Sequence, residues 1–296
     1  MTSDVAFAGG RNRPVCQDYG LAGAVQVGDA EQRWAMAADG CGSEPHTDVG
    51  ARLLAHAAAR QIHELAAMPL FRHDHAMGWL TSCVHTARTV GDAMRLPPAA
   101  LHATLLAVVT DADDNYRVLL GGDGVIAARH RDTGVIEVTR YQFAREMPIY
   151  PLYLTDRGGL ARWVEAAGSE PLTVRHGAID PDPRTPTRWV EFKGMADCYP
   201  YTHTFAAREY DAVAVLTDGA EAFTVRSADG TADLPVLLED AARALAGFKG
   251  LQGSFVRRRL HGAAKEFAAR GWWPGDDYTV AAVAADWFDD APDGGE

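Results

Sequence analysis

Cysteine is scarce in this chain, and the few cysteines present do not indicate a disulfide framework or a zinc site. Four occur among the 296 residues, and no two of them form a C-x-x-C pair. Small disulfide-rich domains and cysteine zinc sites both depend on closely spaced cysteines. We therefore expect reduced thiols of the kind found in intracellular proteins, at Cys16, Cys41, Cys83 and Cys198.

Long apolar runs and an excess of positive charge are also missing. No run approaches the roughly 18 apolar residues of a membrane span, and the first residues lack the basic and apolar regions of a signal peptide. Twenty-eight basic residues stand against 40 acidic ones, giving a formal net charge of −12. We expect a cytoplasmic protein that binds neither membranes nor nucleic acid, because both are anionic. The basic cluster Arg257–Arg259 fits a solvated helix face or a partner contact.

Nucleotide-binding loops and protein nucleophiles are not indicated either. Glycines flank Asp123, but neither G-x-G-x-x-G nor G-x-x-x-x-G-K-[ST] occurs in the sequence. A G-x-S-x-G elbow is absent, and no cysteine–histidine pairing suggests a nucleophilic thiol. The sequence therefore agrees best with a reaction that needs no nucleophile from the protein.

The residues that are present describe an ordinary globular protein with 47% hydrophobic and 23% charged residues. Apolar spacing predicts four helices, over 48–67, 78–94, 232–247 and 251–270. Alternating or continuous apolar runs predict strands over 1–10, 21–27, 33–38, 101–109, 116–120, 125–129, 211–216 and 276–284.

The stretch from about 141 to 208 differs from the rest because seven prolines interrupt its candidate elements. We expect a single domain over residues 1–286, with 141–208 as an elaborated insertion that either selects the substrate or serves as a structural flap. Residues 287–296 are predicted to form an acidic, flexible tail. The histidines at 73 and 75, in a polar link between helices, fit plain surface better than a metal pair.

Aspartates recur at the ends of the predicted strands. The clearest case is Asp39–Gly40, where an apolar run stops at a turn that exposes a carboxylate and a backbone carbonyl; the same dipeptide is also the commonest turn sequence. If the sheets bring such strand ends together, the carboxylates raise one another's pKa unless cations lie between them. The five aspartates are Asp18, Asp39, Asp123, Asp218 and Asp276.

Oxygen ligands of this kind favour Mg²⁺ or Mn²⁺ over zinc or copper. Two such ions can activate a water molecule for in-line attack on phosphorus. The residue pattern alone therefore indicates a metal-assisted hydrolase as one interpretation, beside the turn interpretation of each Asp–Gly pair.

The motifs taken in order resemble the metal-dependent protein phosphatase 2C family, in a bacterial-type variant. The resemblance runs from about residue 5 to 286. It rests on Arg13 with Cys16–Asp18, then Ala38–Ser43, His46–Ala51, Ala103–Leu105, Gly122–Gly124, Thr217–Gly219 and Asp276–Val280.

This resemblance implies an α/β fold, a four-layer αββα sandwich in which two antiparallel sheets are flanked by helices. It also implies two Mg²⁺ or Mn²⁺ ions at one end of the sandwich. Asp39 would bridge both ions and the Gly40 carbonyl would complete one of them, while Asp218 and Asp276 would hold the other. Asp18 would order metal-bound water.

The resemblance further implies that Arg13 binds the substrate phosphate, as a bidentate donor beside the bridging water. Three departures from the family pattern bear on activity. Gln17 stands where many members have glutamate. Cys41 stands where some have a histidine proposed to protonate the leaving group, which leaves metal-bound water or His46 as candidates. Ala222 stands where an aspartate often binds a third ion with Asp123; only Glu221 is adjacent as a substitute.

The function implied is a metal-dependent serine/threonine phosphatase acting on a phosphorylated protein, with a cognate serine/threonine kinase as a further partner. The alternative is a weak or inactive phosphatase-fold module that binds a phosphoprotein, which Gln17 and Ala222 keep open. A third interpretation is hydrolysis of a small phosphorylated metabolite selected by the 141–208 segment.

Overall fold

The computed structural model describes residues 1–11, 13–65, 71, 73–194 and 199–285. The predicted tail 287–296 and Cys198 lie outside the described residues, as do the side chains of residues 73 and 74. No helix in the described part of the chain combines the length and apolar character needed to cross a membrane.

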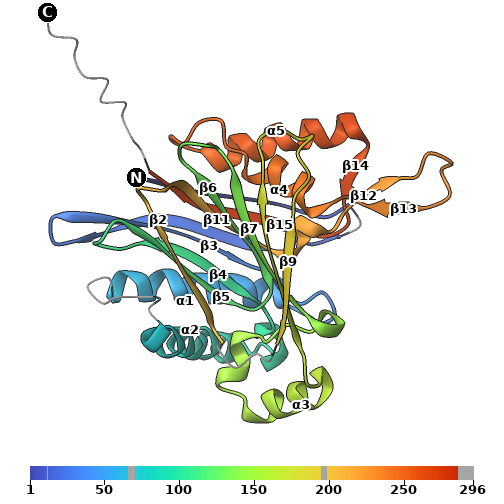
Figure 1. Cartoon of the computed structure of the whole chain (residues 1–296). Coiled ribbons are helices and arrows are strands. Elements are labelled where there is room, and N and C mark those ends of the chain that lie inside the picture. The colour runs from blue at the N-terminus through green and yellow to red at the C-terminus, as the bar shows by residue number, and fades with distance from the viewer. Residues whose placement is uncertain (12, 66–70, 72, 195–198, 286–296) are drawn as a thin grey trace, which may run out of the picture.

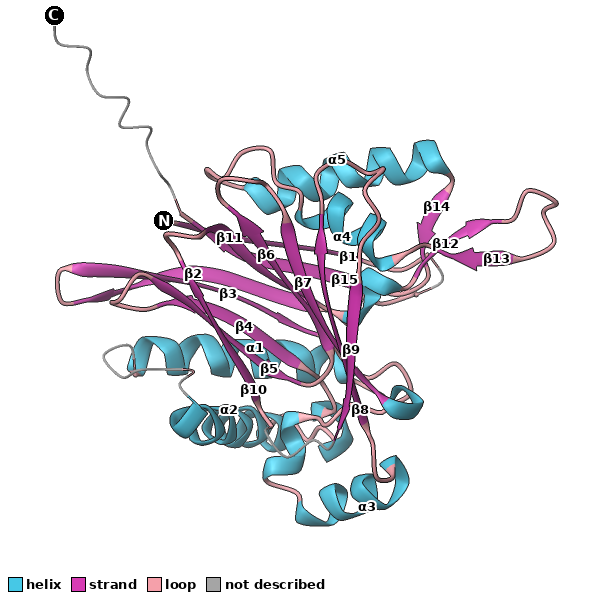
Figure 2. Ribbon diagram, in the orientation of Figure 1, coloured by secondary structure: helices cyan, strands magenta, loops and turns pink. Residues whose placement is uncertain are grey.

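Two antiparallel sheets face each other in the middle of the molecule (Figures 1 and 2). The larger has the order β1 (Thr2–Ala8), β15 (Tyr278–Ala284), β11 (Tyr210–Leu216), β6 (Gly124–His130), β7 (Ile136–Phe143), β8 (Leu172–Ile179) and β9 (Trp189–Gly194). The smaller has the order β10 (Tyr201–Ala206), β5 (Asn115–Gly121), β4 (Leu105–Thr110), β3 (Ala30–Ala38) and β2 (Tyr19–Val27).

Helices cover the outer side of each sheet (Figure 2). α1 (Thr47–Glu64) and α2 (His73–Ala93) lie on the five-stranded sheet, and α4 (Leu238–Ala246) and α5 (Phe255–Arg270) on the seven-stranded sheet. α3 (Arg157–Ala167) projects at one end. The four-layer αββα sandwich implied by the sequence resemblance is therefore confirmed.

Strand β15 shows why the sandwich has two cores. Its side chains alternate between faces, so Ala281 and Val283 join the core between the sheets, while Val280 and Ala282 join the core under α4 and α5. Every residue of β15 is buried because both faces of the strand are covered.

Three of the predicted helices start several residues away from those observed. The helix predicted over 251–270 begins four residues later, at Phe255. The helix predicted over 78–94 begins five residues earlier, at His73. The helix predicted over 232–247 is wrong in its first part. Asp233–Pro235 form the strand β13, which pairs with β12 (Phe223–Arg226), and α4 starts only at Leu238. A third strand, β14 (Trp272–Pro274), completes this small sheet.

The proline-rich stretch 141–208 supplies strands to both main sheets. β8 and β9 extend the seven-stranded sheet, and β10 forms one side of the other. The connection between β7 and β8 carries the short helices η2 (Ala144–Glu146) and η3 (Pro151–Leu154) and then α3. Two further short helices are η1 (Pro98–Leu101), which precedes β4, and η4 (Asp218–Glu221), which follows β11.

Candidate active site

The aspartates singled out in the sequence come together at one end of the sandwich. Burial raises the pKa of Asp39 well above its usual value, and the charges of Asp218, Asp18 and Asp123 raise it further. Asp276 in turn raises the pKa of Asp218. Carboxylates influence one another in this way only at short range. The fold thus places all five within one electrostatic neighbourhood.

Asp18 is the most deeply enclosed of these groups, with 1% of its surface exposed. Its Oδ2 accepts hydrogen bonds from the hydroxyls of Thr217 and Thr279, both at 2.7 Å. Its Oδ1 is buried and meets no N–H or hydroxyl donor among the described residues, and its carboxyl neighbour is Asp39. Burial raises the pKa of Asp18 to about 7. An oxygen in this position needs either a proton or a cation.

The backbone around Asp39 is held on both sides. Its amide donates to Thr104 Oγ1 at 3.1 Å, and its carbonyl accepts from the Thr104 amide at 2.8 Å. The next residue, Gly40, bridges to Ala103, and a Cβ at Gly40 would lie 2.6 Å from the Thr47 carbonyl oxygen. Glycine at this position lets the β3 end approach the start of α1 closely.

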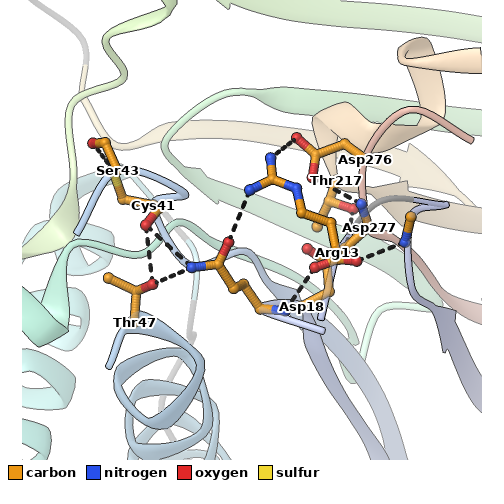
Figure 3. Close-up of polar contacts among 10 residues, drawn as sticks. Arg13, Asp18, Cys41, Ser43, Thr47, Thr217, Asp276 and Asp277 are labelled. Atoms are coloured by element: carbon orange, nitrogen blue, oxygen red, sulfur yellow. Dashed lines mark hydrogen bonds and ion pairs between the residues drawn. The ribbon is translucent and has the colours of Figure 1, made fainter. Parts of the chain in front are cut away.

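Arg13 reaches across the site from the loop before β2 (Figure 3). Its Nη2 forms an ion pair with Asp276 Oδ2 at 2.7 Å, and its Nη1 donates to Gln17 Oε1 at 3.2 Å. Gln17 Nε2 in turn donates to Thr47 Oγ1 at 2.9 Å. Gln17 therefore links the Arg13 loop to the start of α1 through neutral hydrogen bonds.

Asp218 lies just after β11, and part of its surface is exposed to solvent. Protein atoms surround it on the remaining sides, and this desolvation, together with Asp276, raises its pKa to about 6. Its neighbour Gly219 has no room for a side chain, because a Cβ there would collide with the Asp277 carbonyl oxygen.

Asp277 is a site residue to which the sequence analysis assigned no role of its own. Its Oδ1 accepts from the Gly10 amide and its Oδ2 from the Gln17 amide, both at 2.7 Å. This buried carboxylate fastens the loop that carries Arg13 and Asp18 to the start of β15 (Figure 3). Its position directly after Asp276 was the only sequence signal for this role.

Asp123 has a basic neighbour that the sequence did not indicate. Burial and the charge of Asp218 raise the pKa of Asp123 well above its usual value, while Arg140 acts in the opposite direction. Arg140 forms an ion pair with Glu221. Glu221, the sequence candidate for replacing the carboxylate missing at Ala222, is thus engaged by a guanidinium.

Aromatic side chains from the β7–β8 connection border the Cys41 side of the site. Tyr150 stacks on His102 with ring centroids 5.2 Å apart. Burial raises the pKa of Tyr150, and so does its hydrogen bond with Cys41. The thiol of Cys41 also lies 3.2 Å from the Ser43 hydroxyl. His46, a sequence candidate for the general acid, is an exposed residue at the start of α1.

The donor set suits a hard divalent cation. Among the described residues, no three His, Cys, Asp or Glu side chains are already spaced as the ligands of one ion. Asp18 Oδ1, which accepts no hydrogen bond from an N–H or hydroxyl group, nevertheless lies beside the Asp39 carboxylate. A cation would stabilise these crowded carboxylate oxygens. The residues present therefore fit Mg²⁺ or Mn²⁺.

The sequence is similar to one known protein family. A family model described as protein phosphatase 2C matches residues 10–246, most of the chain. No curated protein matches the chain significantly.

The solved structures to which the chain is similar share little sequence with it. A serine/threonine phosphatase of S. agalactiae is 14% identical, with 96% of this chain and 99% of that chain covered and a TM-score of 0.49. The SiaA-PP2C domain of Pseudomonas aeruginosa is 11% identical, with 96% and 86% covered and a TM-score of 0.47. The phosphatase domain of SpoIIE from Bacillus subtilis is 13% identical, with 97% and 95% covered and a TM-score of 0.35.

The match over residues 10–246 and the αββα sandwich agree with each other and with the order of the aspartate motifs. The chain belongs to the protein phosphatase 2C family.

Proposed function

We propose that this chain is a Mg²⁺- or Mn²⁺-dependent phosphatase, formed by one domain over residues 1–286, that hydrolyses phosphoserine or phosphothreonine in a protein. The observation that carries the proposal is the pair of adjacent carboxylates of Asp18 and Asp39. One oxygen of this pair is buried without a donor, and Arg13 lies across the same site.

The carboxylates of Asp39, Asp218 and Asp276, the Gly40 carbonyl and Asp18 are the groups that would hold two ions. When bound, the ions lower the pKa of a water molecule so that it can attack phosphorus. The protein's part is to hold the carboxylates in place. The Thr217 and Thr279 hydroxyls fix Asp18, and the two Thr104 hydrogen bonds fix the backbone of Asp39.

Arg13 would bind the phosphate group of the substrate. Its guanidinium is partly exposed, at 30% of the side chain, and carries donors in a planar fork that matches two phosphate oxygens. Its ion pair with Asp276 supports this role, because Asp276 is one of the carboxylates proposed to hold an ion. Arg13 and a divalent cation would therefore compete for the same carboxylate, and cation binding would free Arg13 for the substrate.

A cavity beside the site offers space for the chain around a phosphorylated residue. It has a volume of about 470 Å³ and is lined by residues 142–146 and Thr173, at the start of the proline-rich stretch. Glu146 in this lining contributes to the raised pKa of Asp218, so the cavity adjoins the carboxylates. This supports a role for the stretch in substrate choice.

The proposal is tested by phosphate release from a phosphothreonine peptide in Mn²⁺ and in excess chelator. We expect turnover only in Mn²⁺, its loss in Asp39→Asn, and its retention in Asp29→Asn, a matched change in an exposed turn. A folded wild-type protein that releases no phosphate at any Mn²⁺ or Mg²⁺ concentration would contradict the proposal.

The alternative is a phosphatase-fold module that binds a phosphoprotein without turnover. The Arg140–Glu221 ion pair, next to Ala222, is the observation in its favour, because it ties up a carboxylate near Asp123 and Asp218. Binding of the same phosphopeptide without phosphate release, unchanged in Asp39→Asn, would favour the module. Turnover of a small aryl phosphate but no phosphopeptide would favour a metabolite as substrate.

A further inference from the structure

The strand β9 ends the seven-stranded sheet, and no described strand pairs with its outer edge. Residues on this edge present backbone groups that another strand can hydrogen-bond. β9 is also the most exposed strand of the two main sheets, with four of its six residues exposed. Three strands separate it in the sheet from β11, which Asp218 follows; β15, which Asp276 precedes, lies beyond β11.

One face of β9 is apolar although it reaches solvent. Val190 and Phe192 are 52% and 61% exposed. They pair with His176 and Val174 of β8, which in turn pair with Thr139 and Tyr141 of β7.

This face belongs to the inner side of the sheet. Tyr141 hydrogen-bonds His203 of β10, in the opposite sheet, at 2.7 Å. Because the opposite sheet has five strands and ends at β10, it does not cover β9. The inner face of the larger sheet therefore overhangs the smaller one.

The other face of β9 carries one acidic and one basic side chain two residues apart. Glu191 and Lys193 have 48% and 59% of their side chains exposed, and their own contact is long, at 3.9 Å. The contact of Glu191 with Arg175 is also 3.9 Å. Exposed pairs at such distances contribute little, so both charges remain able to face a partner.

We propose that a second copy of this chain docks on β9, so that the two strands pair antiparallel about a two-fold axis and join the larger sheets edge to edge. In the register that places Phe192 opposite the second copy's Phe192, Glu191 faces the second copy's Lys193, and Lys193 faces its Glu191. The strand is thus complementary to itself in both charge and apolar side chains, as an isologous interface requires.

Neighbouring registers lose this complementarity. Paired residues point to the same face, so the strands can shift only in steps that keep Val190 and Phe192 on the apolar side. A shift in one direction places Glu191 opposite Glu191, and a shift in the other places Lys193 opposite Lys193. Like charges directly opposite each other destabilise a strand pair, so only one register is favoured.

Charge reversal tests the proposal through sedimentation velocity over a range of protein concentrations. The wild type is expected to form a dimer whose fraction rises with concentration. Glu191→Lys and Lys193→Glu each create like-charge pairs across the axis and are expected to weaken the dimer by about tenfold. The double variant Glu191→Lys with Lys193→Glu restores opposite charges and is expected to dimerise within about twofold of the wild type.

Two further variants make the test independent of those charges. Phe192→Lys places like charges on the axis and is expected to abolish the dimer, whereas Glu165→Lys, on an exposed part of α3, is expected to leave it unchanged. The proposal is overturned if the wild type stays monomeric, if the single reversals dimerise as well as the wild type, or if the double variant does not recover. Since β9 contributes no residue to the phosphatase site, Asp39→Asn should dimerise normally.

Discussion

Asp18 is the residue at which the electrostatic strain of the site is most evident. Its side chain is buried, one oxygen lacks a donor, and the Asp39 carboxylate lies beside it. Two hydroxyl hydrogen bonds favour the ionised form, but burial outweighs them and raises the pKa from 3.8 to about 7. The folded protein therefore holds a proton on Asp18 at pH values where the unfolded chain has released it.

This shift predicts a pH dependence for the metal-free protein. Between about pH 4 and pH 7 the folded state binds more protons than the unfolded state, so the contribution of Asp18 to stability falls as the pH rises through this window. Thermal unfolding in excess chelator measures it. Relative to Asp18→Asn, the wild type should lose stability from pH 5 to pH 7.5; a parallel response of the two proteins would contradict the assigned shift.

Arg13 carries the prediction for substrate binding. Arg13→Lys keeps the charge but removes the planar fork, so kcat/KM for a phosphopeptide in Mn²⁺ should fall about tenfold or more. Arg11→Lys is the matched control, because Arg11 lies over Trp273, 5.1 Å from the ring centroid, and has no ion pair with the residues that the structure describes. Steady-state kinetics that change equally in the two variants would remove Arg13 from its proposed role.

At the scale of single residues, the sequence predicted which aspartates would gather but not how they are held. Asp18, Asp39 and Asp218 were identifiable because each ends or precedes an apolar run. Arg140, in contrast, lies inside β7, and its ion pair joins it to Glu221 in η4 (Asp218–Glu221), which follows β11 two strands away in the sheet. Such a contact depends on strand order, which local spacing does not encode.

At the scale of elements, the contact between α1 and η1 positions the loop that holds Asp39. Gly50 in α1 is buried, and a Cβ there would collide with the Ala100 carbonyl oxygen of η1. Residues 102–104 follow directly and hydrogen-bond the backbone of Cys41 and Asp39. Residues 102–104 therefore connect the α1–η1 contact to the backbone of Asp39.

Two helical glycines provide a matched pair for testing this packing. Gly50→Ala should destabilise the protein by about 1–3 kcal/mol through overpacking. Gly78→Ala, in α2, meets no atom within 4 Å and should stabilise it by about 0.5–1 kcal/mol through helix propensity. Chemical denaturation of both variants measures the difference; equal effects would mean that the α1–η1 contact is loose.

Elements with a long periodic pattern were predictable, and short ones were not. The strands on either side of Asp39 and Asp218 were expected from their apolar runs. β13 has three residues, all exposed, and exists because β12 pairs with it. Three residues carry no periodic signal, and Pro235 was the one local sign that the predicted helix could not start before it.

At the scale of the whole molecule, the sandwich serves to bring distant strand ends to one place. Asp39 and Asp276 are separated by most of the chain. Arg13 forms an ion pair with Asp276, and Gln17 in the same loop hydrogen-bonds Thr47, at the start of the helix that follows Asp39. The family resemblance predicted this convergence because it specified the order of strands. Composition and periodicity alone indicated the type of many elements, but not α3 or strands such as β7 and β8, and not how the elements are arranged.

The measurement that tests this account most directly is calorimetric titration of the metal-free protein with Mn²⁺ at pH 7.5. Two ions should bind per wild-type chain, and binding should be lost or strongly weakened in Asp39→Asn while Asp29→Asn behaves as the wild type. A folded wild-type protein that takes up no Mn²⁺, or an Asp39→Asn variant that binds it equally well, would contradict the assignment of these carboxylates.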